Sequence, residues 1–405
     1  SNKFPVFGGS TGKGPYDPAR QLLENYIECP HYLEPDFFSR FEQLLGELRI
    51  DLVFPAWDPI VALCSEMRVE GVTFVAPRPE IARLLLSKRD TYERLCGVAS
   101  VPRLFSPETA ALPLFAKPDR GSGSRGSYIV RSPEELAVAT REDALLCEYL
   151  PGEEYTVDCV SDRAGRLLFA NVRVRASIGR GVALGTRPVD EPDIRRQVEA
   201  IAAELCIEGP WFAQFKKNAA GNAILLEVNA RVGGSMTLTR LAGVNIPLIA
   251  AFLFSGHEVR VPRLREDVVL NRCLRNLCAG APFDWVVWDL DDTLLRKDGR
   301  PDPDVMACLY DLHNRGKRQL LLTRNPDAEA VLSQRRVPLF FEEICISEDK
   351  PGALAALTER HGIPIDRCVM VNDSYAERFP LEDAFPQLRI VTPDAIEYLG
   401  REGAQ

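Results

Sequence analysis

The segment 223–235, a short apolar strand that runs into a polar cluster, constrains the fold of this chain more than any other part of the sequence. Its apolar residues are typical of a buried strand, and Glu227, Asn229 and Arg231 occupy alternating positions. Because successive side chains point to opposite faces of a strand, these three should share one face. Their carboxylate, amide oxygen and guanidinium suit a magnesium nucleotide. Taken alone, however, the segment fits a half-buried antiparallel strand with a polar outer face better than a binding site.

Length and composition indicate a globular protein of several domains. A chain of 405 residues exceeds the usual ~100–200 residues of one domain. With 49 basic and 58 acidic residues, the net charge is -9, which predicts neither a nucleic-acid nor a membrane partner. The eleven cysteines are scattered and form no CxxC pair, as in a protein with reduced thiols. Without a signal pattern or an apolar run of membrane-spanning length, we expect a cytoplasmic location.

A glycine cluster, residues 8–14, follows a strand-like run near the N-terminus. It invites comparison with a phosphate-binding P-loop, but that motif requires Ser or Thr after its Gly-Lys pair, and Gly14 follows Lys13 here. Phe7 also occupies the position of the first glycine of the motif. The cluster is therefore predicted to be a flexible turn after a strand.

The next part of the chain alternates between helical and strand patterns. Asp36 is the predicted N-cap of an amphipathic helix over 37–49, and a buried strand is expected at 50–55. A helix over 59–69 and a strand at 72–76 follow. This alternation predicts a small parallel sheet of a nucleotide-binding type.

A glycine-rich loop joins two strand-like runs further along. It covers residues 119–126, between strands predicted at 114–118 and 127–130, and a helical stretch over 79–96 precedes it. Glycine lets the backbone approach phosphates closely, so such a hairpin can close over a nucleotide. Because no helix follows the loop, it is neither a Rossmann nor a Walker motif. A flexible surface hairpin fits about equally well.

Strands predicted at 145–150 and 153–160 flank a short Pro-Gly turn. Glu148 and Glu154 lie close to this turn and could hold an adenine and a ribose, although a solvated hairpin fits as well. A second hairpin is predicted between the strand at 211–217 and the strand of the segment 223–235. It should place these two strands, and their polar side chains, next to each other.

In that second hairpin, Gln214 is expected to lie beside Glu227 and Asn229. Three arginines between the two hairpins could hold substrate carboxylates bidentately, although a solvated basic face is slightly favoured for any single one. These arginines are Arg173, Arg175 and Arg187.

The strand pattern restarts after a linker at 278–283. Several apolar runs then end in polar residues, so that a strand at 285–288 leads into the sequence Asp-Leu-Asp-Asp-Thr, and later strands end at Thr323 and at Asn372-Asp373. In an open parallel sheet the carboxyl ends of the strands line one crevice, which is the usual position of a site.

The first two thirds of the chain resemble the ATP-grasp superfamily, nearest its carbamoyl-phosphate-synthase-like and biotin-carboxylase-like branch. The resemblance implies a Rossmann-like pre-ATP-grasp domain over 1–85, without its first βα unit, and an ATP-grasp domain over 86–277. The residues that carry it are Lys88, Lys117-Pro118 with the loop 119–126, Cys147-Glu148, Gly152–Asp158, Gln214 and Glu227–Arg231.

This resemblance also implies roles for individual residues. Arg231 would steady the transferred phosphoryl group, and the family's Asn-Pro-Arg is Asn229-Ala230-Arg231 here, a change that removes only the stiffening of the turn by proline. The implied ligands of ATP are Lys88, Lys117, Gly121, Ser122, Gly123, Ser124, Glu148, Leu150 and Glu154. The implied ligands of Mg²⁺, with Mn²⁺ as an alternative ion, are Gln214, Glu227 and Asn229.

Residues 284–405 resemble the haloacid-dehalogenase superfamily, whose signature is an apolar strand followed by DxDxT. The resemblance implies a capless Rossmannoid domain with a parallel sheet, in which Asp289 is the nucleophile and Asp291 the general acid. Thr323 and Lys350 would bind the phosphoryl group. The implied Mg²⁺ ligands are Asp289, Asp291 and Asp373. Glu377 follows in the expected order, although Asn372 stands where the family often has glycine.

Together these features predict a multidomain α/β and α+β protein with two active sites. The leading hypothesis is an ATP-dependent carboxylate-amine ligase, acting through an acyl phosphate, fused to a phosphohydrolase that acts through an aspartyl phosphate. Its partners would be a small carboxylate, an amine and a phosphorylated small molecule, and a homodimer is left open. The alternatives are a phosphatase regulated by a non-ligating ATP-binding module and a non-catalytic scaffold.

Overall fold

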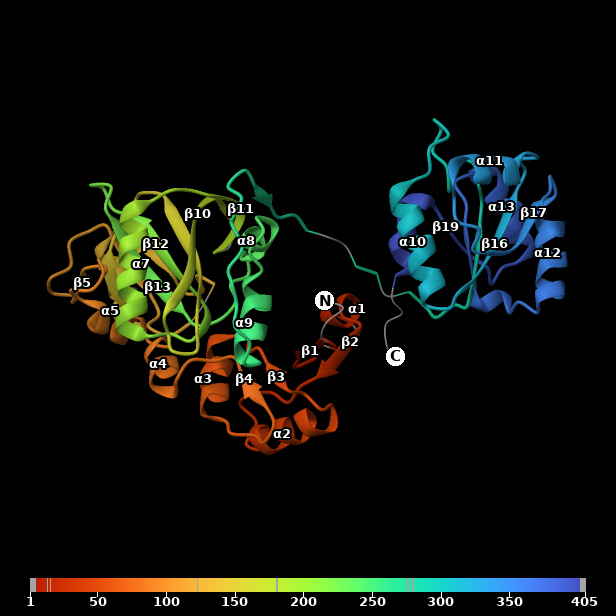
Figure 1. The fold of residues 1–405 in the computed structure, drawn as a ribbon. Coiled ribbons are helices and arrows are strands. Elements are labelled where there is room, and N and C mark those ends of the chain that lie inside the picture. The colour runs from red at the N-terminus through yellow and green to blue at the C-terminus, as the bar shows by residue number, and fades with distance from the viewer. Residues whose placement is uncertain are drawn as a thin grey trace. The chain divides into compact units, whose positions relative to one another are not determined.

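The computed structural model describes residues 5–12, 14, 16–121, 123–179, 181–274, 277–278 and 280–400. Contacts between Cα atoms group the chain into two compact units, which are Pro30–Leu274 and the combination of Ser1–Cys29 with Arg275–Gln405. The elements of each unit are labelled in Figure 1. None of the described helices is both long enough and apolar enough to cross a bilayer.

The N-terminal segment forms a small parallel strand pair. Strand β1 (Phe7–Ser10) pairs with β2 (Asn25–Glu28), and the short helix α1 (Ala19–Leu22) connects them. The prediction of a flexible turn at the glycine cluster is therefore wrong for its first residues. A side chain at Gly9 would bring its Cβ to 2.5 Å from Sγ of Cys29, so glycine is required by this close approach.

The Pro30–Leu274 unit opens with the predicted alternation of helices and strands. Helix α2 (Phe37–Glu47), strand β3 (Leu52–Val53), helix α3 (Asp58–Glu66) and strand β4 (Thr73–Phe74) follow one another, and the two strands pair in parallel. Both strands are shorter than predicted. Asp36 is the N-cap of α2, but its side chain makes no capping hydrogen bond.

The helical stretch predicted over 79–96 is two helices, α4 (Pro79–Leu84) and α5 (Lys88–Leu95). Ser87 lies between them as the N-cap of α5, where its hydroxyl accepts a hydrogen bond from the backbone N–H of Asp90. This cap starts a new helix and explains the break.

A four-stranded antiparallel sheet carries the glycine-rich loop. Its order is β5 (Leu104–Phe105), β8 (Leu145–Glu148), β6 (Leu114–Lys117) and β7 (Tyr128–Val130), and helix α6 (Pro133–Arg141) follows β7. The loop joins β6 to β7. The small core beneath it consists of Leu114, Ala116, Val130, Ala139 and Leu146.

A second, six-stranded antiparallel sheet has the order β13-β12-β9-β10-β11-β14. Alternate residues of its central strands pack against helix α7 (Pro192–Leu205) in the main core. Helix α9 (Ile246–Phe254) covers only one end of the opposite face of the sheet. The polar side chains on the rest of that face are available to form a site. The strands are β9 (Glu154–Ser161), β10 (Leu167–Gly179), β11 (Val182–Pro188), β12 (Gly209–Lys217), β13 (Ala223–Asn229) and β14 (Leu270–Asn271), and helix α8 (Thr237–Leu241) precedes α9.

The C-terminal residues form a five-stranded parallel sheet between two layers of helices, which Figure 1 shows. The strand order is β17 (Phe341–Ile346), β16 (Arg318–Thr323), β15 (Trp285–Trp288), β18 (Cys368–Val371) and β19 (Arg389–Val391). Because both faces are covered, the central strands are apolar at nearly every position.

Each face of this sheet has its own core. Helices α10 (Pro303–Asn314) and α11 (Ala328–Arg335) pack on one face together with Trp288, whereas α12 (Lys350–His361) and α13 (Tyr375–Ala384) pack on the other with Val287. Two short 3-10 helices, η1 (Ile365–Arg367) and η2 (Pro393–Leu399), complete the described elements of this part.

Candidate functional site

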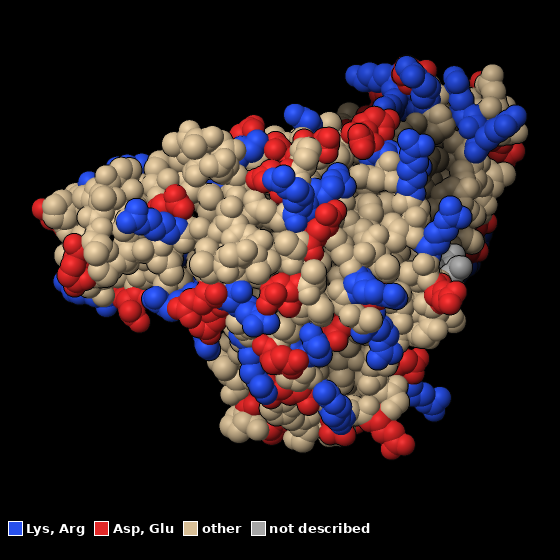
Figure 2. Space-filling view, turned by 60° about the vertical axis from the view of Figure 1, so that its left-hand side comes forward, with Lys and Arg blue, Asp and Glu red and all other residues tan. Residues whose placement is uncertain are grey.

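The polar face of the six-stranded sheet lines a cavity of about 460 Å³ in the Pro30–Leu274 unit. Eight of its lining residues are Lys or Arg and three are Glu, so the cavity has an excess of positive charge. In Figure 2, positive and negative side chains are interspersed over most of the visible face, and Lys and Arg predominate at its upper right. The predicted site residues that line the cavity are Lys88, Lys117, Gly121, Gly123, Ser124, Glu148, Leu150, Glu154, Arg173, Arg175, Gln214, Glu227 and Arg231.

Strand register brings Glu227 and Gln214 together. The two residues are directly paired across β13 and β12, as the sequence predicts, whereas Asn229 is paired with Phe212. A bulge follows, because Phe215 pairs with Leu225 and leaves one residue of β13 unmatched. Register therefore places a carboxylate and an amide side by side on the cavity face.

Glu227 also lies near two lysine ammonium groups. Burial raises the pKa of Glu227, while the charges of Lys88 and Lys117 act in the opposite direction. The half-buried carboxylate is thus held in a site where a cation stabilises its charged form.

Lys117 is buried at the end of β6, where its Nζ donates to Oη of Tyr92 at 2.5 Å. The hydroxyl of Tyr92 donates in turn to the backbone oxygen of Leu226, also at 2.5 Å. Burial lowers the pKa of Lys117, although the Cys147 side chain opposes this shift. The ammonium is held in one orientation, at the wall of the cavity.

Lys88, the first residue of α5, fastens the glycine-rich loop. Its Nζ donates to the backbone oxygens of Asp119 and Gly121, both at 3.1 Å. Gly121 and Gly123 have φ of 134° and 69°, in a region that favours glycine. Ser122, which the resemblance implies as a ligand, lies outside the described residues.

The two glutamates predicted to hold adenine and ribose have different surroundings. Oε1 of Glu148 accepts a hydrogen bond from the backbone N–H of Arg103 at 3.0 Å. Glu154 pairs with Arg175 and lies 4.0 Å from Nζ of Lys216. The charge of Glu154 is therefore already balanced by Arg175 and Lys216. Among the described residues, the Glu148 side chain has only a backbone hydrogen bond, and it is more available to a ligand.

Asn229 lines an adjoining cavity of about 580 Å³, to which Lys88, Gly121 and Glu227 also contribute. Its Nδ2 is buried and makes no hydrogen bond to the described residues. Mg²⁺ commonly takes one or two protein oxygen ligands together with substrate phosphates, and the carboxylate of Glu227 with the amide oxygen of Gln214 fits this ion. Asn229 could contribute only its Oδ1, because the unsatisfied Nδ2 is a donor. Oε1 of Gln214 also accepts from Nη1 of Arg175 at 2.7 Å, which leaves one lone pair free.

Arg231 follows β13 and pairs with Asp58, the first residue of α3. Its Nε and Nη2 donate to the two carboxylate oxygens at 2.9 and 3.1 Å, and its guanidinium lies 5.2 Å from the ring centroid of Phe212. This bidentate pair fixes the direction of Arg231, which lines the cavity.

The three arginines predicted to bind substrate are placed differently. Arg173 is buried against Asp158, and Arg175 donates to Gln214, to Glu154 and to the backbone oxygen of Gly181. Arg187 is exposed on β11 and does not belong to the described lining of the cavity. The structure thus brings two of the three arginines to the same face.

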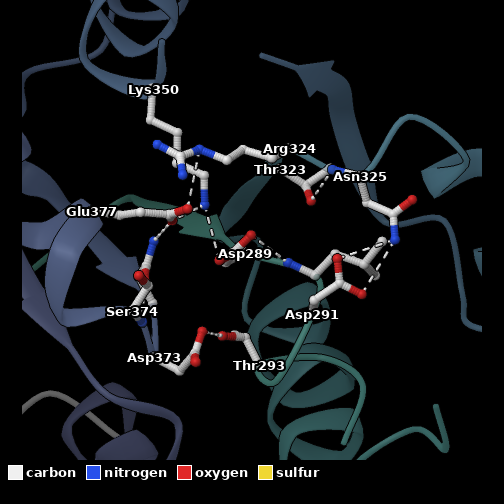
Figure 3. A network of polar contacts seen from close by, with 12 residues as sticks. Asp289, Asp291, Thr293, Thr323, Arg324, Asn325, Lys350, Asp373, Ser374 and Glu377 are labelled. Atoms are coloured by element: carbon white, nitrogen blue, oxygen red, sulfur yellow. Dashed lines mark hydrogen bonds and ion pairs between the residues drawn. The ribbon is translucent and has the colours of Figure 1, made fainter. Parts of the chain in front are cut away.

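A second cluster lies at the carboxyl ends of the parallel strands, as Figure 3 shows. Asp289 follows β15, and its Oδ2 is 2.9 Å from Nζ of Lys350, which also contacts Glu377. Burial raises the pKa of Asp289 to about 6, although Lys350 opposes this shift. Burial also acts to raise the pKa of Glu377, but bonds from Lys350 and Asn372 lower it overall. One buried lysine therefore lies between two carboxylates, and Arg324 is a second cationic partner of Glu377, with its Nε 3.2 Å from Oε1.

Asp291 and Thr323 meet Asn325 on the other side of Asp289 (Figure 3). Nδ2 of Asn325 donates to both carboxylate oxygens of Asp291, at 3.2 and 3.1 Å. The backbone N–H of Asn325 donates to Oγ1 of Thr323 at 3.1 Å. Asn325 therefore links two of the predicted catalytic residues.

Asp373 lies beside Thr293, whose Oγ1 donates to it at 3.4 Å. Burial and the nearby Asp292 raise the pKa of Asp373. The carboxylates of Asp289, Asp291 and Asp373 suit a hard cation, but each is directed to a protein partner. Among the described residues, no three His, Cys, Asp or Glu side chains form a group that could hold a metal ion. The observed arrangement therefore does not fit a metal at this cluster.

Several residues of these clusters have no role in the sequence analysis. Asp158 could have been found, because Glu154, Thr156 and Asp158 are polar at alternating positions of an otherwise apolar strand. Tyr92 and Asp58 carry no comparable signal, since Tyr92 bonds Lys117 and Leu226, 25 and 134 positions away, and Asp58 bonds Arg231, 173 positions away.

Comparison with known proteins agrees with the architecture of the Pro30–Leu274 unit. Residues 140–273 match the model of a family described as ATP-grasp in the biosynthetic pathway with Ter operon. The chain contains an ATP-grasp domain. The family match ends before residue 284, so it does not test the haloacid-dehalogenase resemblance of residues 284–405. No match was found among curated proteins.

Solved structures share the fold of the ATP-grasp domain at low sequence identity. The biotin carboxylase domain of 2-oxoglutarate carboxylase from Hydrogenobacter thermophilus, a dimer in complex with MgADP and bicarbonate, has 19% identity and a TM-score of 0.52 over 61% of this chain and 64% of that one. Biotin carboxylase from Campylobacter jejuni has 15% identity and a TM-score of 0.52, over 63% and 66%.

A third similar structure is not a biotin carboxylase. N5-carboxyaminoimidazole synthetase from Staphylococcus aureus, complexed with ADP, has 15% identity and a TM-score of 0.50, over 63% of this chain and 72% of that chain. This chain spans about two thirds of the length of the two biotin carboxylase structures. The likeness concerns the fold.

Proposed function

We propose that the ATP-grasp domain is an ATP-dependent ligase that joins a carboxylate to an amine. The observation that carries this proposal is the meeting of Lys117, Gln214 and Glu227 at one cavity with an excess of basic residues. A polyphosphate is the ligand that such a charge distribution favours. The bound MgADP and ADP of the similar structures support the same cofactors, ATP and Mg²⁺.

The residues of the cavity suggest how the transfer would proceed. The substrate carboxylate attacks the γ-phosphorus of ATP and ADP leaves. The amine then attacks the acyl carbon of the resulting acyl phosphate, and inorganic phosphate leaves as the amide bond forms. Bound Mg²⁺ would neutralise the phosphate oxygens, with Glu227, Gln214 and Asn229 as its protein ligands. Lys117 and Arg231 would stabilise the charge that spreads over the transferred phosphoryl group.

The glycine-rich loop has a separate role in this proposal. An acyl phosphate hydrolyses in water, so the site must exclude water during the transfer. Lys88 joins the loop to α5 through the backbone oxygens of Asp119 and Gly121. Phosphates that draw Lys88 away would free the loop to close over them.

An ADP-release screen over pairs of carboxylates and amines, with mass detection of the product, tests the ligase proposal on the full chain. The proposal expects ADP release only with a matched pair, together with the mass of the condensed product. ATP binding that only changes the rate of a phosphatase would instead support a regulatory module.

We further propose that the C-terminal domain hydrolyses a phosphate ester of a small molecule. The specific observation is the buried Lys350 between Asp289 and Glu377, with Thr323 and Asp291 on the other side of Asp289. Asp289 would attack phosphorus to give an aspartyl phosphate, and Asp291 would protonate the leaving alcohol oxygen. Water would then attack the aspartyl phosphate, which releases inorganic phosphate and regenerates Asp289. Lys350 and Thr323 would bind the phosphoryl oxygens. No step through a metal is included, because the three carboxylates are directed to separate partners.

A further inference from the structure

Arg173 differs from the other basic residues of the ATP-grasp cavity because it is buried and rigidly anchored yet has an unused donor. Its side chain is 1% exposed, and it lines the cavity that contains Glu227 and Gln214. Nε and Nη2 donate to the two carboxylate oxygens of Asp158, at 2.9 and 3.0 Å. Nη1 is buried and makes no hydrogen bond to the described residues.

The anchor of Arg173 is itself fixed by further hydrogen bonds. Oγ1 of Thr239, on α8, donates to Oδ2 of Asp158 at 2.6 Å, and Nδ2 of Asn171 donates to Thr239 at 2.8 Å. These bonds use the Nε side of the guanidinium and hold the group in one plane. The opposite edge, formed by Nη1 and Nη2, is left as a preorganised pair of donors for a planar oxyanion.

Strand register shows where Arg173 lies relative to the residues proposed to bind magnesium. Glu227 pairs with Gln214, Gln214 with Thr156, and Thr156 with Arg173, so the four residues form one row across β13, β12, β9 and β10. Cross-strand neighbours in such a row point to the same face of the sheet. Arg173 is therefore at the opposite end of the row from Glu227, within the same cavity.

The neighbouring Arg175 is not equivalent. Its guanidinium donates to Glu154, to Gln214 and to the backbone oxygen of Gly181, so it connects protein groups to one another. Arg173 has one carboxylate partner and an unsatisfied nitrogen. A buried donor without a partner is unfavourable, and a bound oxyanion would remove that cost.

We propose that Arg173 is the specificity-determining residue that binds the carboxylate group of the ligase substrate, through its Nη1 and Nη2 edge. This inference rests on the proposed ligase function and adds to it the position of the carboxylate. Asp158, Thr239 and Asn171 act as positioning residues, because they orient the guanidinium and do not reach the substrate themselves.

Binding measurements on the full chain test this proposal. Removing Arg173 alone would leave the buried carboxylate of Asp158 without a counter-charge, so the test uses the double variant Arg173→Gln/Asp158→Asn, which replaces the ion pair by a neutral hydrogen-bonded pair. Asp158→Asn alone keeps the guanidinium, and Arg196→Gln removes an exposed arginine of α7 that pairs with Asp193. Calorimetric titrations use MgADP, and then bicarbonate, acetate, succinate, glutamate or inorganic phosphate with MgADP present.

The expected result is that at least one carboxylate binds the parent and Arg196→Gln, and that its Kd rises roughly tenfold or more in the double variant. Asp158→Asn keeps the guanidinium but weakens its anchor, so its Kd should lie between those of the parent and the double variant. MgADP should bind all four proteins within about twofold. Equal carboxylate binding by parent and double variant would overturn the proposal, as would a parent that binds MgADP but none of the carboxylates.

The remaining outcomes separate this inference from the proposed function. A loss confined to inorganic phosphate would show that Arg173 binds the phosphoryl group, and a matching loss of MgADP would show a nucleotide contact or a structural role. Either would contradict a substrate-carboxylate role while leaving the ligase proposal standing. A parent that does not bind MgADP would instead remove the proposed function itself.

Discussion

The two candidate sites use opposite ways of assembling charged groups. In the ATP-grasp domain, Glu227, Gln214 and Arg173 come from different antiparallel strands and meet because of strand register. In the C-terminal domain, Asp289 follows β15 and Thr323 is the last residue of β16, and they meet because these parallel strands end at one edge. The first site has many cations around a broad cavity. The second has one buried lysine between two carboxylates.

This difference indicates which ligand each site can accept. An excess of basic side chains around 460 Å³ suits a large polyanion whose charge must be spread over several partners. A carboxylate held 2.9 Å from a buried ammonium is instead suited to attack a single phosphorus atom. The predictions below test whether the two sites are separate, beginning with the largest expected effect.

Asp289→Asn should reduce hydrolysis of p-nitrophenyl phosphate at least about 10³-fold, because an amide cannot replace the carboxylate as nucleophile. Initial rates of the full chain measure this. Asp304→Asn, at an exposed carboxylate on α10, is the matched control and should stay within about twofold. A variant that retains activity at Asp289 would place the chemistry elsewhere.

Lys117→Met should reduce substrate-dependent ADP release by about 10²- to 10³-fold, because it removes a buried cation from the phosphate site while preserving its length. The matched control is Lys217→Met, since Lys217 pairs with Glu191 and is not part of the described cavity lining. An equal fall in ADP release in both variants would show that Lys117 has no special role in the cavity.

Breaking a buried ion pair should lower the free energy of unfolding more than breaking an exposed one. Arg173→Met leaves the buried carboxylate of Asp158 without a counter-charge, and should lower the free energy of unfolding of the ATP-grasp domain by about 3–5 kcal/mol. Arg166→Met breaks the pair with Asp162, in which Arg166 is 82% exposed, and should cost about 0–1 kcal/mol. Calorimetric unfolding of both variants measures the difference, and equal costs would contradict the assigned burial of Arg173.

The smallest effect is expected at Arg187, which is exposed on β11. Arg187→Gln should change the Kd of MgATP by less than about twofold, because the side chain does not border the described cavity. Isothermal titration would detect a larger change. Such a change would mean that β11 contributes more to the site than its register indicates.

The same contrast explains what could be predicted from the sequence. The C-terminal cluster was foreseeable because each polar residue directly follows an apolar strand, so chain order alone brings Asp289, Thr323 and Asp373 to one edge. The pairing of Glu227 with Gln214 was foreseeable for a similar local reason, since one short turn joins their strands.

The remaining contacts depend on three-dimensional packing. The pairing of Arg231 with Asp58 joins residues 173 positions apart, and no local pattern indicates it. The bulge in β13 is likewise set by packing, as is the close approach of Gly9 to Cys29. Arg173 and Arg187 look alike in the sequence, but register buries one in the cavity wall and exposes the other.

The most direct test of the account is the variant Glu227→Gln, assayed in one preparation for both substrate-dependent ADP release and p-nitrophenyl phosphate hydrolysis. The account predicts that ADP release falls by about 10²-fold or more, because the carboxylate beside Gln214 is lost. Phosphate-ester hydrolysis should remain at the parent rate. Equal loss of both activities would contradict the existence of two separate sites.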